Sequence, residues 1–345
     1  MATIREIAGK AGVSAGAVSR ILNNDETLSV SEATREKVLK TAEELGYKKK
    51  TKKRNFGDSD FTMGIVQWFS IEEELADPYY LLVRRGIEDY CTKNNISIVR
   101  FFPSDYSGAP DSRELFSKLK EDLKTTDGLV CVGKFSSKEV KEFISICSNT
   151  VFLDMDARDF KVSSITMDFS KAVAEVLEYL TGLGHTKIAY LGGREYVGSN
   201  EPIKDPRETA FVSYMNKKKI DYKKYLVTGS FTSSSGYEMM NELFDKKNIP
   251  TAVFAASDAI ALGAMRSINE HGLKIPKDIS IIGFNDLDTC NYTTPALTSV
   301  HAPAYEMGAA GANMVFTNSK LQAGVPLRIK IPCELIKRES CAELM

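Results

Sequence analysis

The chain has no long hydrophobic run. Across its 345 residues, no stretch approaches the ~18 to 20 consecutive apolar residues that a membrane helix needs. Its first thirty residues carry scattered charges instead of the apolar segment of a secretory signal. We therefore expect a cytoplasmic protein with no membrane partner.

Residues that commonly carry catalysis or bind metals are also scarce. The chain has three histidines and six widely spaced cysteines, with no Cys-x-x-Cys pair. It lacks Gly-x-Ser-x-Gly, a P-loop, Gly-x-Gly-x-x-Gly and His-Glu-x-x-His. His185 and His271 fit predicted helix ends, where a cation is favoured. These absences argue against an enzyme, and we expect neither a cofactor nor a bound metal.

Charge is balanced overall but unevenly distributed. The formal net charge is −1, yet residues 1–54 hold 12 Lys and Arg against 7 Asp and Glu. Six of the seven residues 48–54 are basic, and 55–60 have the composition of a linker. A basic run can be a solvated tether, but its position after a helical head favours contact with phosphates.

Residues 1–47 have the pattern of three short amphipathic helices. Thr3 and Glu6 form a Thr-x-x-Glu capping box, which predicts a helix over 4–11. Gly12 supplies a turn, Ser14 caps a second helix, and Ser29 or Ser31 caps a third that ends at Gly46. This is the helix-turn-helix arrangement that places a second helix in the major groove, although a helical bundle of another purpose fits the same pattern.

The residues of this head resemble the lactose/galactose repressor (LacI/GalR) family. The resemblance is carried by Thr3-Ile-Arg-Glu-Ile-Ala, Ala11-Gly-Val-Ser, Val18-Ser-Arg-Ile-Leu-Asn and Thr34-Arg-Glu-Lys-Val. It implies a DNA-binding transcriptional repressor in which Ala15, Gly16 and Arg20 occupy base-reading positions. Arg20 can bond guanine bidentately, whereas Ala15 and Gly16 are too small to do so. The same resemblance places phosphate contacts at Thr3, Ser14, Ser19 and Asn23.

The segment 48–61, expected to be a basic hinge, departs from the family pattern. The family has an Ala-Arg-x-Leu core here, whose leucine wedges into the minor groove. In this chain Arg54 falls at the arginine position and Phe56 at the leucine position. A phenylalanine wedge is chemically reasonable; alternatively, the lysine run clamps the DNA backbone and Phe56 packs on the core.

From residue 62 the chain alternates short apolar runs with amphipathic stretches, which is typical of a parallel α/β sheet. Two sets of strands are predicted, with helices beginning near Pro78, Asp111 and Ser136. The strands are expected at 63–67, 96–102, 128–132 and 150–154, and then at 187–191, 225–228, 252–255 and 279–284. Two such subdomains create a cleft at the carboxyl ends of their strands.

We expect the ligand-binding and dimerisation core to span 62–345. One subdomain is expected over 62–160 plus about 287–325, and the other over 161–286 plus the C-terminal segment.

The family resemblance extends over this body. Leu183-Gly-His-Thr-Lys-Ile-Ala-Tyr-Leu-Gly-Gly, Ser257-Asp-Ala-Ile-Ala-Leu-Gly-Ala-Met-Arg, Ile275-Pro-Lys-Asp-Ile-Ser-Ile-Ile-Gly-Phe-Asn-Asp and Pro295-Ala-Leu-Thr-Ser-Val look like the family's periplasmic-binding-protein-like core of two doubly wound parallel-sheet subdomains. Asp77-Pro-Tyr-Tyr, Phe231-Thr-Ser-Ser-Ser-Gly and the context of Asp154 resemble the β-galactoside-responsive subgroup, of the type that controls the evolved β-galactosidase. The resemblance implies a homodimer on double-stranded operator DNA and a small sugar effector.

The effector site implied by the resemblance combines a guanidinium fork, hydroxyl acceptors and an aromatic platform. Arg207 lies at the sugar-clamping position and Phe231 at the stacking position. Asp154 and Asn285 end strands and would accept hydroxyl protons, while Asp77 and Ser257 start helices facing the same cleft. Each position has a structural alternative: a helix cap or loop for Asp154 and Asp77, the core for Phe231, and a turn for Asn285.

Two other readings compete with the sugar-responsive repressor. A transport binding protein would carry a signal peptide and would lack the head. A regulator of the same fold could instead answer to a nucleobase or to a phosphorylated protein partner, and the sequence leaves that alternative open.

Overall fold

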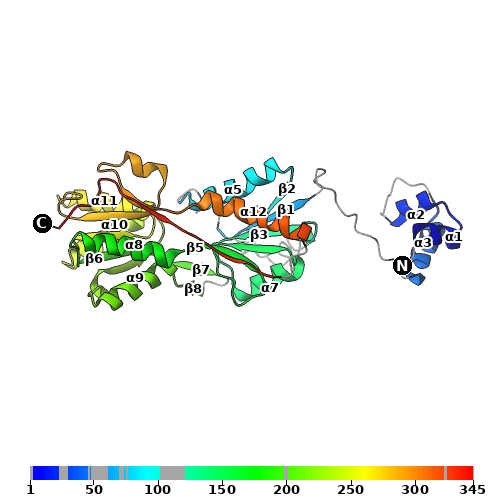
Figure 1. Cartoon of the computed structure of the whole chain (residues 1–345), viewed down its shortest axis with the longest axis horizontal. Coiled ribbons are helices and arrows are strands. Elements are labelled where there is room, and N and C mark those ends of the chain that lie inside the picture. The colour runs from blue at the N-terminus through cyan, green and yellow to red at the C-terminus, as the bar shows by residue number, and fades with distance from the viewer. Residues whose placement is uncertain are drawn as a thin grey trace. The chain divides into compact units, whose positions relative to one another are not determined.

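The computed structural model describes residues 3–22, 30–45, 47, 61–69, 74, 77–101, 121–197, 201–321 and 325–344. The chain divides into two compact units, Met1–Asp58 and Ser59–Met345, which we call the head and the core (Figure 1). Within the described ranges, no helix has the length and apolar character needed to cross a membrane.

The head consists of α1 (Ile4–Ala11), α2 (Ala15–Leu22) and α3 (Glu32–Glu44). The predicted capping box of Thr3 and Glu6 is present, and Gly12 takes the left-handed conformation, with φ 73°, that ends α1. Ser14 Oγ accepts a hydrogen bond from the Ala17 amide at 3.1 Å. Ser31 Oγ accepts one from the Thr34 amide at 3.3 Å. These caps confirm the predicted starts of all three helices; Ser29 and Gly46 lie outside the described residues.

The apolar side chains of the head form a small hydrophobic cluster of their own. Ile7, Ala11, Val18, Ile21 and Val38 are buried and pack together from all three helices. Burial of these positions fixes the outward face of α2.

The first lobe of the core is a six-stranded parallel sheet with helices packed on it. Its strand order is β13 (Arg328–Ile331), β5 (Ser163–Met167), β4 (Thr150–Leu153), β3 (Gly128–Val132), β1 (Thr62–Gln67) and β2 (Ser97–Phe101). Its helices include α5 (Tyr79–Lys93), α7 (Ser137–Ile146) and α12 (Ala304–Leu321). Pro78 and Ser136 stand at the N-caps of α5 and α7, as predicted. The helix expected near Asp111 lies outside the described residues.

The second lobe repeats this architecture. Its sheet has the order β14 (Glu334–Ile336), β12 (Thr298–His301), β11 (Ser280–Asn285), β10 (Ala252–Ala255), β6 (Ile188–Gly193) and β9 (Leu226–Gly229), and only β14 in it runs antiparallel to its neighbour. Its helices include α8 (Phe169–Gly182), α9 (Pro206–Lys218), α10 (Ser233–Asp245) and α11 (Asp258–Glu270), with short 3-10 turns η2 (Lys223–Tyr225) and η3 (Asp288–Tyr292). A small antiparallel hairpin, β7 (Glu195–Val197) and β8 (Glu201–Ile203), lies between β6 and α9.

The chain crosses between the lobes three times: after β5, between β12 and α12, and between β13 and β14. The expected subdomain ranges therefore differ from the lobes, since β5 and β13 belong to the first sheet and β12 to the second. All eight predicted strands are present within two residues of their expected ends. The prediction missed six strands of the described part of the chain, because each mixes polar or charged residues with apolar ones and so contains no apolar run: β5, β7, β8, β12, β13 and β14.

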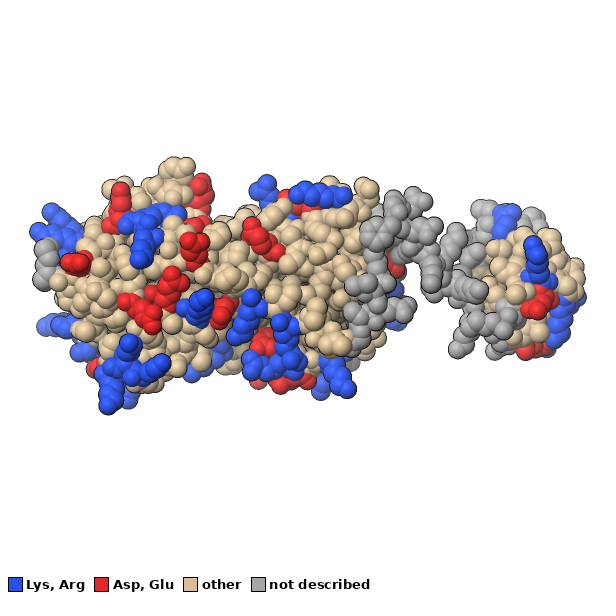
Figure 2. All heavy atoms as spheres, viewed as in Figure 1, with Lys and Arg blue, Asp and Glu red and all other residues tan. Residues whose placement is uncertain are grey.

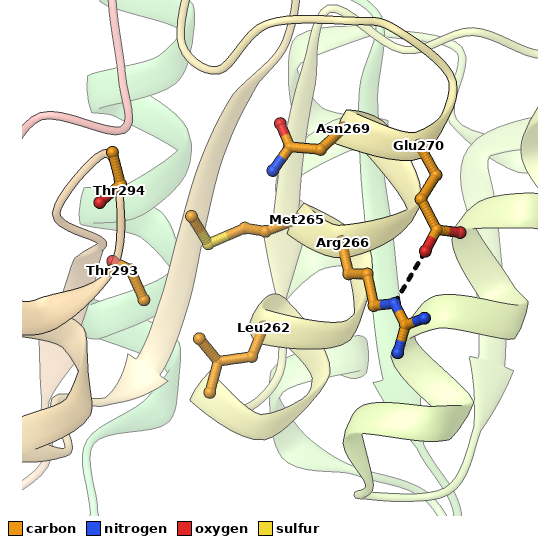
Figure 3. Close-up of a pocket in the computed structure, with 7 residues that line it drawn as sticks. All are labelled: Leu262, Met265, Arg266, Asn269, Glu270, Thr293 and Thr294. Carbon is orange, nitrogen blue, oxygen red and sulfur yellow. Dashed lines mark hydrogen bonds and ion pairs between the residues drawn. The ribbon is translucent and has the colours of Figure 1, made fainter.

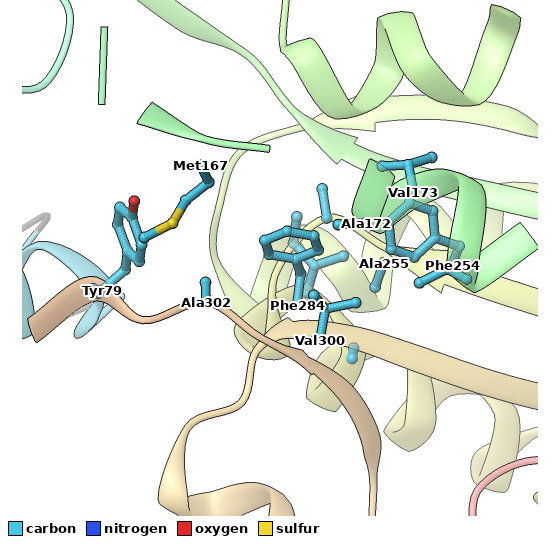
Figure 4. Packing of buried hydrophobic residues seen from close by; sticks show 14 of the residues in the cluster. Tyr79, Met167, Ala172, Val173, Phe254, Ala255, Phe284, Val300 and Ala302 are labelled. Carbon is cyan, nitrogen blue, oxygen red and sulfur yellow. The ribbon is translucent and has the colours of Figure 1, made fainter. Parts of the chain in front are cut away.

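One hydrophobic cluster runs through both lobes. At the crossings, Tyr79 from α5, Met167 from the end of β5 and Ala302 from the segment before α12 lie near one another (Figure 4). Phe284 and Val300 continue the cluster into the second lobe. The contact between the two lobes therefore rests on shared apolar packing.

Glycines set two close helix crossings, one in each lobe. A Cβ on Gly308 of α12 would lie 1.9 Å from the Val83 carbonyl oxygen of α5. A Cβ on Gly263 of α11 would lie 1.8 Å from the Ser233 carbonyl oxygen of α10. Each helix pair can approach this closely only because no side chain intervenes.

We expect Gly308→Ala to destabilise the core by about 1–3 kcal/mol, because the added methyl meets backbone that cannot swing aside. The matched control is Gly182→Ala, whose Cβ would have no atom within 4 Å. Urea unfolding measures both. Equal midpoints for the two variants would contradict the close crossing.

Candidate functional site

The outward face of α2 presents the predicted base-reading residues. Ala15, Gly16 and Arg20 are exposed, and Ser19 is half-buried. A Cβ on Gly16 would meet only the Ser14 hydroxyl, at 3.9 Å, so the fold does not require a glycine there. The absence of a side chain at Gly16 therefore leaves space for close approach of another surface.

Thr3 and Ser14 stand at the N-termini of α1 and α2. Their hydroxyl oxygens accept backbone amides, at 3.3 Å from Glu6 and 3.1 Å from Ala17. Helix N-termini of this kind favour anions. Asn23, Arg54 and Phe56 lie outside the described residues.

In the core, the predicted effector residues come from the carboxyl ends of strands in both sheets. Asp154 directly follows β4, and Asp77 precedes α5 in the first lobe. In the second lobe Asn285 ends β11, Phe231 follows β9, and Arg207 opens α9. In parallel α/β sheets this edge is where ligands bind. We call this region the lobe junction.

Asp154 is buried and already held by three donors. Tyr80 donates its hydroxyl to Oδ2 at 3.0 Å and Tyr79 donates to Oδ1 at 3.4 Å. The Lys134 ammonium donates to both the carboxylate and the main-chain carbonyl of Asp154. Asp154 takes a left-handed φ of 63°, which fixes this geometry at the strand end. Asp154 is thus the centre of an internal network that sequence reasoning did not predict.

The surroundings of this network keep Lys134 charged and the two tyrosine hydroxyls protonated. Burial lowers the pKa of Lys134, but the carboxylates of Asp154 and Glu195 outweigh it, and the pKa of Lys134 is raised. Burial, with the charge of Asp154, raises the pKa of both tyrosine hydroxyls well above the ordinary value. Lys134 therefore stays a cation, and the tyrosines stay hydrogen-bond donors.

Arg207 is held in a cage of one carboxylate and three aromatic rings. Its Nε lies 3.0 and 3.1 Å from the two carboxylate oxygens of Asp205, and one terminal nitrogen donates to the Ala256 carbonyl at 2.7 Å. The other terminal nitrogen lies 2.8 Å from Asp205 Oδ2. A guanidinium has five N–H donors, so one on each terminal nitrogen is left for a ligand.

The rings around Arg207 include the predicted Phe231. The guanidinium carbon lies 4.9 Å from the centroid of Phe231, 5.3 Å from that of Phe169 and 5.4 Å from that of Phe284. The structure thus brings Phe231 and Arg207 together, and adds two rings that the sequence did not single out. Such cation–π contacts fix the plane of the fork.

Asp77 and Asn285 meet across the junction. The Asn285 amide nitrogen lies 3.4 and 3.5 Å from the two carboxylate oxygens of Asp77. Asp77 also accepts the Tyr79 amide at 3.1 Å, and burial raises its pKa. Asn285 has an unusual φ of 105°, a strained value of the kind found at functional sites.

Ser257 is the N-cap of α11. It is fully buried, and its hydroxyl oxygen accepts the Ile260 amide at 3.3 Å. The structure places it at the expected helix start, and this bond gives it a structural role in capping.

Several junction residues were missed by sequence reasoning, namely Lys134, Tyr79, Tyr80, Phe169, Glu195 and Trp68. Lys134 is the second residue after β3, and Asp154 is the first after β4. A search for polar residues in the first two positions after each predicted strand would have found Lys134.

Two surface hollows lie apart from the junction residues, each of about 450 Å³. In the first, Leu262, Met265 and Asn269 of α11 face Thr293 and Thr294 (Figure 3). The second is lined by the starts of β4 and β5, the end of α12 and residues 325–326. On the face of the core in Figure 2, basic and acidic side chains intermingle.

Comparison with known proteins identifies the family and the fold. Residues 3–50 match the family described as bacterial regulatory proteins, lacI family, and residues 177–341 match the periplasmic binding protein-like domain. The transcriptional regulator GalR of Streptococcus thermophilus is 35% identical over 342 residues, with 99% of both chains covered. GalR of Lacticaseibacillus casei is 33% identical over 343 residues, again with 99% of each covered.

Solved structures match over nearly the whole length. The lac repressor dimer bound to operator and the anti-inducer ONPF aligns with a TM-score of 0.70 at 25% identity, covering 99% of each chain. The regulator CelR in complex with cellobiose aligns with a TM-score of 0.70 at 24% identity, covering 99% of this chain and 100% of that one.

A helix-turn-helix head joined to a two-lobed periplasmic-binding-like core defines a DNA-binding transcriptional regulator and not an enzyme. The chain belongs to the LacI family of bacterial regulatory proteins and is a transcriptional repressor of the LacI/GalR type.

We expect Lys134→Met to lower the free energy of unfolding at neutral pH by about 3–5 kcal/mol, since it leaves the Asp154 carboxylate buried without its cation. The control Lys138→Met alters an exposed lysine of α7. Adding Asp154→Asn to Lys134→Met should restore part of the loss. Urea unfolding of the wild type, the two single variants and the double variant tests this. A double variant less stable than Lys134→Met would contradict the ion pair.

Proposed function

We propose that this repressor controls sugar-utilisation genes and leaves a palindromic operator when galactose or a β-galactoside binds at the lobe junction. The observation that carries the proposal is the Arg207 fork, fixed by Asp205 and three phenyl rings at the carboxyl ends of the strands. A sugar presents paired hydroxyls and an apolar ring face, which suit a planar double donor beside an aromatic surface.

Acceptors for sugar hydroxyls lie on both sides of the junction. Asp154 and Asp77 come from the first lobe, and Asn285 comes from the second. A ligand that bonds to both lobes stabilises their closed arrangement, because it gains contacts there that the open arrangement lacks. The galactoside class rests on the resemblance of Asp77-Pro-Tyr-Tyr and Phe231-Thr-Ser-Ser-Ser-Gly to the β-galactoside-responsive subgroup. The two GalR relatives support the family of the repressor.

On DNA, α2 would lie in the major groove. Arg20 supplies the bidentate guanine contact, and Ala15 and Gly16 allow close approach to base edges. Thr3, Ser14, Ser19 and Asn23 contact phosphates and set the register. Arg54 and Phe56 belong to the hinge, with Phe56 as the candidate wedge.

A homodimer is needed because one head reads one half-site of a palindrome. We assign part of its interface to the hollow on α11, where Leu262 and Met265 give an apolar floor. The neighbouring Tyr292 is 80% exposed, which is unusual for a large aromatic side chain outside an interface. The lac repressor structure cited above is also a dimer.

We expect Arg20→Lys to relax the operator sequence selected from a random duplex library at one position in each half-site. Loss of a bidentate pair costs about 1–3 kcal/mol of discrimination, while the salt dependence of binding stays the same because the charge is kept. The control is Lys10→Arg, since Lys10 pairs with Glu44 at 3.2 Å. If Arg20→Lys selects the same consensus operator as the wild type, Arg20 does not read a base.

Calorimetric titration with galactose, lactose, allolactose, glucose and a purine, with and without operator, tests the effector. We expect the protein to bind a galactoside, and we expect operator DNA to weaken that binding. By linkage, the galactoside should weaken operator binding by the same factor. Arg207→Lys should abolish galactoside binding, and Arg158→Lys, on an exposed loop residue of the first lobe, should not. Operator binding without any sugar response would instead favour a nucleobase or a phosphorylated protein as controller.

A further inference from the structure

The β7–β8 hairpin of the second lobe reaches the first lobe. Its strands pair in antiparallel register, with Glu195 opposite Ile203 and Val197 opposite Glu201. The indole Nε1 of Trp68, just after β1, donates to the Tyr196 carbonyl at 3.1 Å. The hairpin therefore bridges the junction beside the effector residues.

Glu195, the first residue of β7, is half-buried at this bridge. The Glu195 carboxylate interacts electrostatically with the Lys134 and Arg207 cations and with the carboxylates of Asp154 and Asp205. Those two carboxylates are both hydrogen-bonded and ion-paired. Among the described residues, the Glu195 carboxylate has neither a hydrogen bond nor an ion pair, so it is an acceptor at the junction that is not internally satisfied.

We propose that Glu195 is an effector-binding and specificity-determining residue, which accepts hydroxyl protons from an uncharged sugar and discriminates against a phosphorylated one. This inference rests on the proposed function of the junction and names its ligand class more narrowly. It also assigns the hairpin a role in sensing that ligand.

The charges around Glu195 explain the selection against phosphate. A phosphate carries about −1.5 to −2 charges at neutral pH and needs cations that are not already neutralised. Here Lys134 is paired with Asp154 and Arg207 with Asp205. With Asp77 and Glu195 added, acids outnumber bases at the junction, so a sugar phosphate would be repelled while hydroxyl donors are attracted.

The hairpin couples this contact to lobe closure. Glu195 precedes Tyr196, the residue that accepts the Trp68 bond, so Glu195 stands at the junction when the lobes meet. A sugar hydroxyl that bonds Glu195 then favours the closed arrangement. Trp68 is the only tryptophan in the sequence, which makes its fluorescence a direct probe of this contact.

The test compares Glu195→Gln with a matched control, Glu201→Gln, which alters the exposed glutamate of the partner strand. Galactose, lactose and galactose 6-phosphate are titrated against the full-length protein by calorimetry and by Trp68 fluorescence. Loss of a hydrogen bond to a charged acceptor corresponds to a factor of about ten to a hundred in affinity. We expect Glu195→Gln to weaken galactoside binding by that factor. The ratio of galactose affinity to galactose 6-phosphate affinity should fall by at least the same factor. Glu201→Gln should bind both sugars as the wild type does.

A second measurement is independent of ligand. Burial raises the pKa of Glu195, and Lys134 and Arg207 offset only part of this effect. Because its pKa is higher in the folded state than in the unfolded state, the wild type loses stability relative to Glu195→Gln as the pH rises above the ordinary range of a glutamate. Other titratable groups facing Glu195 are Asp154, Asp205, Tyr80 and Tyr190. They are present in both proteins, so the difference in melting temperature isolates Glu195.

The outcomes separate this inference from the proposed function. Galactoside binding that is equal in wild type and Glu195→Gln, or tighter binding of galactose 6-phosphate by the wild type, overturns the role of Glu195 while leaving the repressor assignment intact. If no galactoside binds the wild type, the proposed effector is wrong. The pH series then decides the role of Glu195. A difference in melting temperature between wild type and Glu195→Gln that widens with pH supports an unpaired Glu195 carboxylate. A difference that stays constant with pH overturns that assignment.

Discussion

Three crossings of the chain between the lobes determine how the core can work. The strands β5, β12 and β13 each leave their sheet at the carboxyl end and pass directly to the other lobe. The carboxyl ends of both parallel sheets are therefore tethered to the same junction. Polar residues that follow the strands meet there whichever lobe they come from, and this explains how Asp77 and Asn285, 208 positions apart, come within hydrogen-bonding range.

Charge at the junction is arranged in internally balanced pairs. Lys134 with Asp154 and Arg207 with Asp205 each place a cation against a carboxylate with little exposure to solvent. Such pairs contribute little net stability compared with apolar packing, but breaking one is costly, so they hold side chains in fixed directions. These pairs orient side chains. The Arg207 fork keeps two N–H groups directed, and Asp154 fixes the two tyrosine hydroxyls that donate to it. The proposed ligand would then meet a preorganised surface.

The sequence predicted the framework of the molecule better than its chemistry. Caps such as Thr3 and Ser14 are local signals, and a buried strand such as 128–132 is an uninterrupted apolar run, so both were found. Strand β13, Arg-Ile-Lys-Ile, lies at the edge of its sheet with charged residues exposed, and nothing in its pattern distinguishes it from a loop. The pairing of Lys134 with Asp154 could not be read either, because it depends on the adjacency of β3 and β4 and not on sequence spacing. Glu195 belongs to a three-residue strand, too short for any periodicity to show.

The glycine crossings bear on how the proposed ligand at the junction would act on a distant part of the chain. In the first lobe, Gly86 and Gly308 bring α5 and α12 into backbone contact, and α5 begins with the tyrosines that hold Asp154. In the second lobe, Gly236 and Gly263 join α10 and α11 in the same way. Backbone packed against backbone does not deform gradually, so each lobe moves as one body. Under the proposed function, a change at the junction would then take the form of a rotation about the three crossings. Because β1 begins at Thr62, close to the boundary between head and core at residues 58 and 59, such a rotation of the first lobe would move the point at which the head is attached.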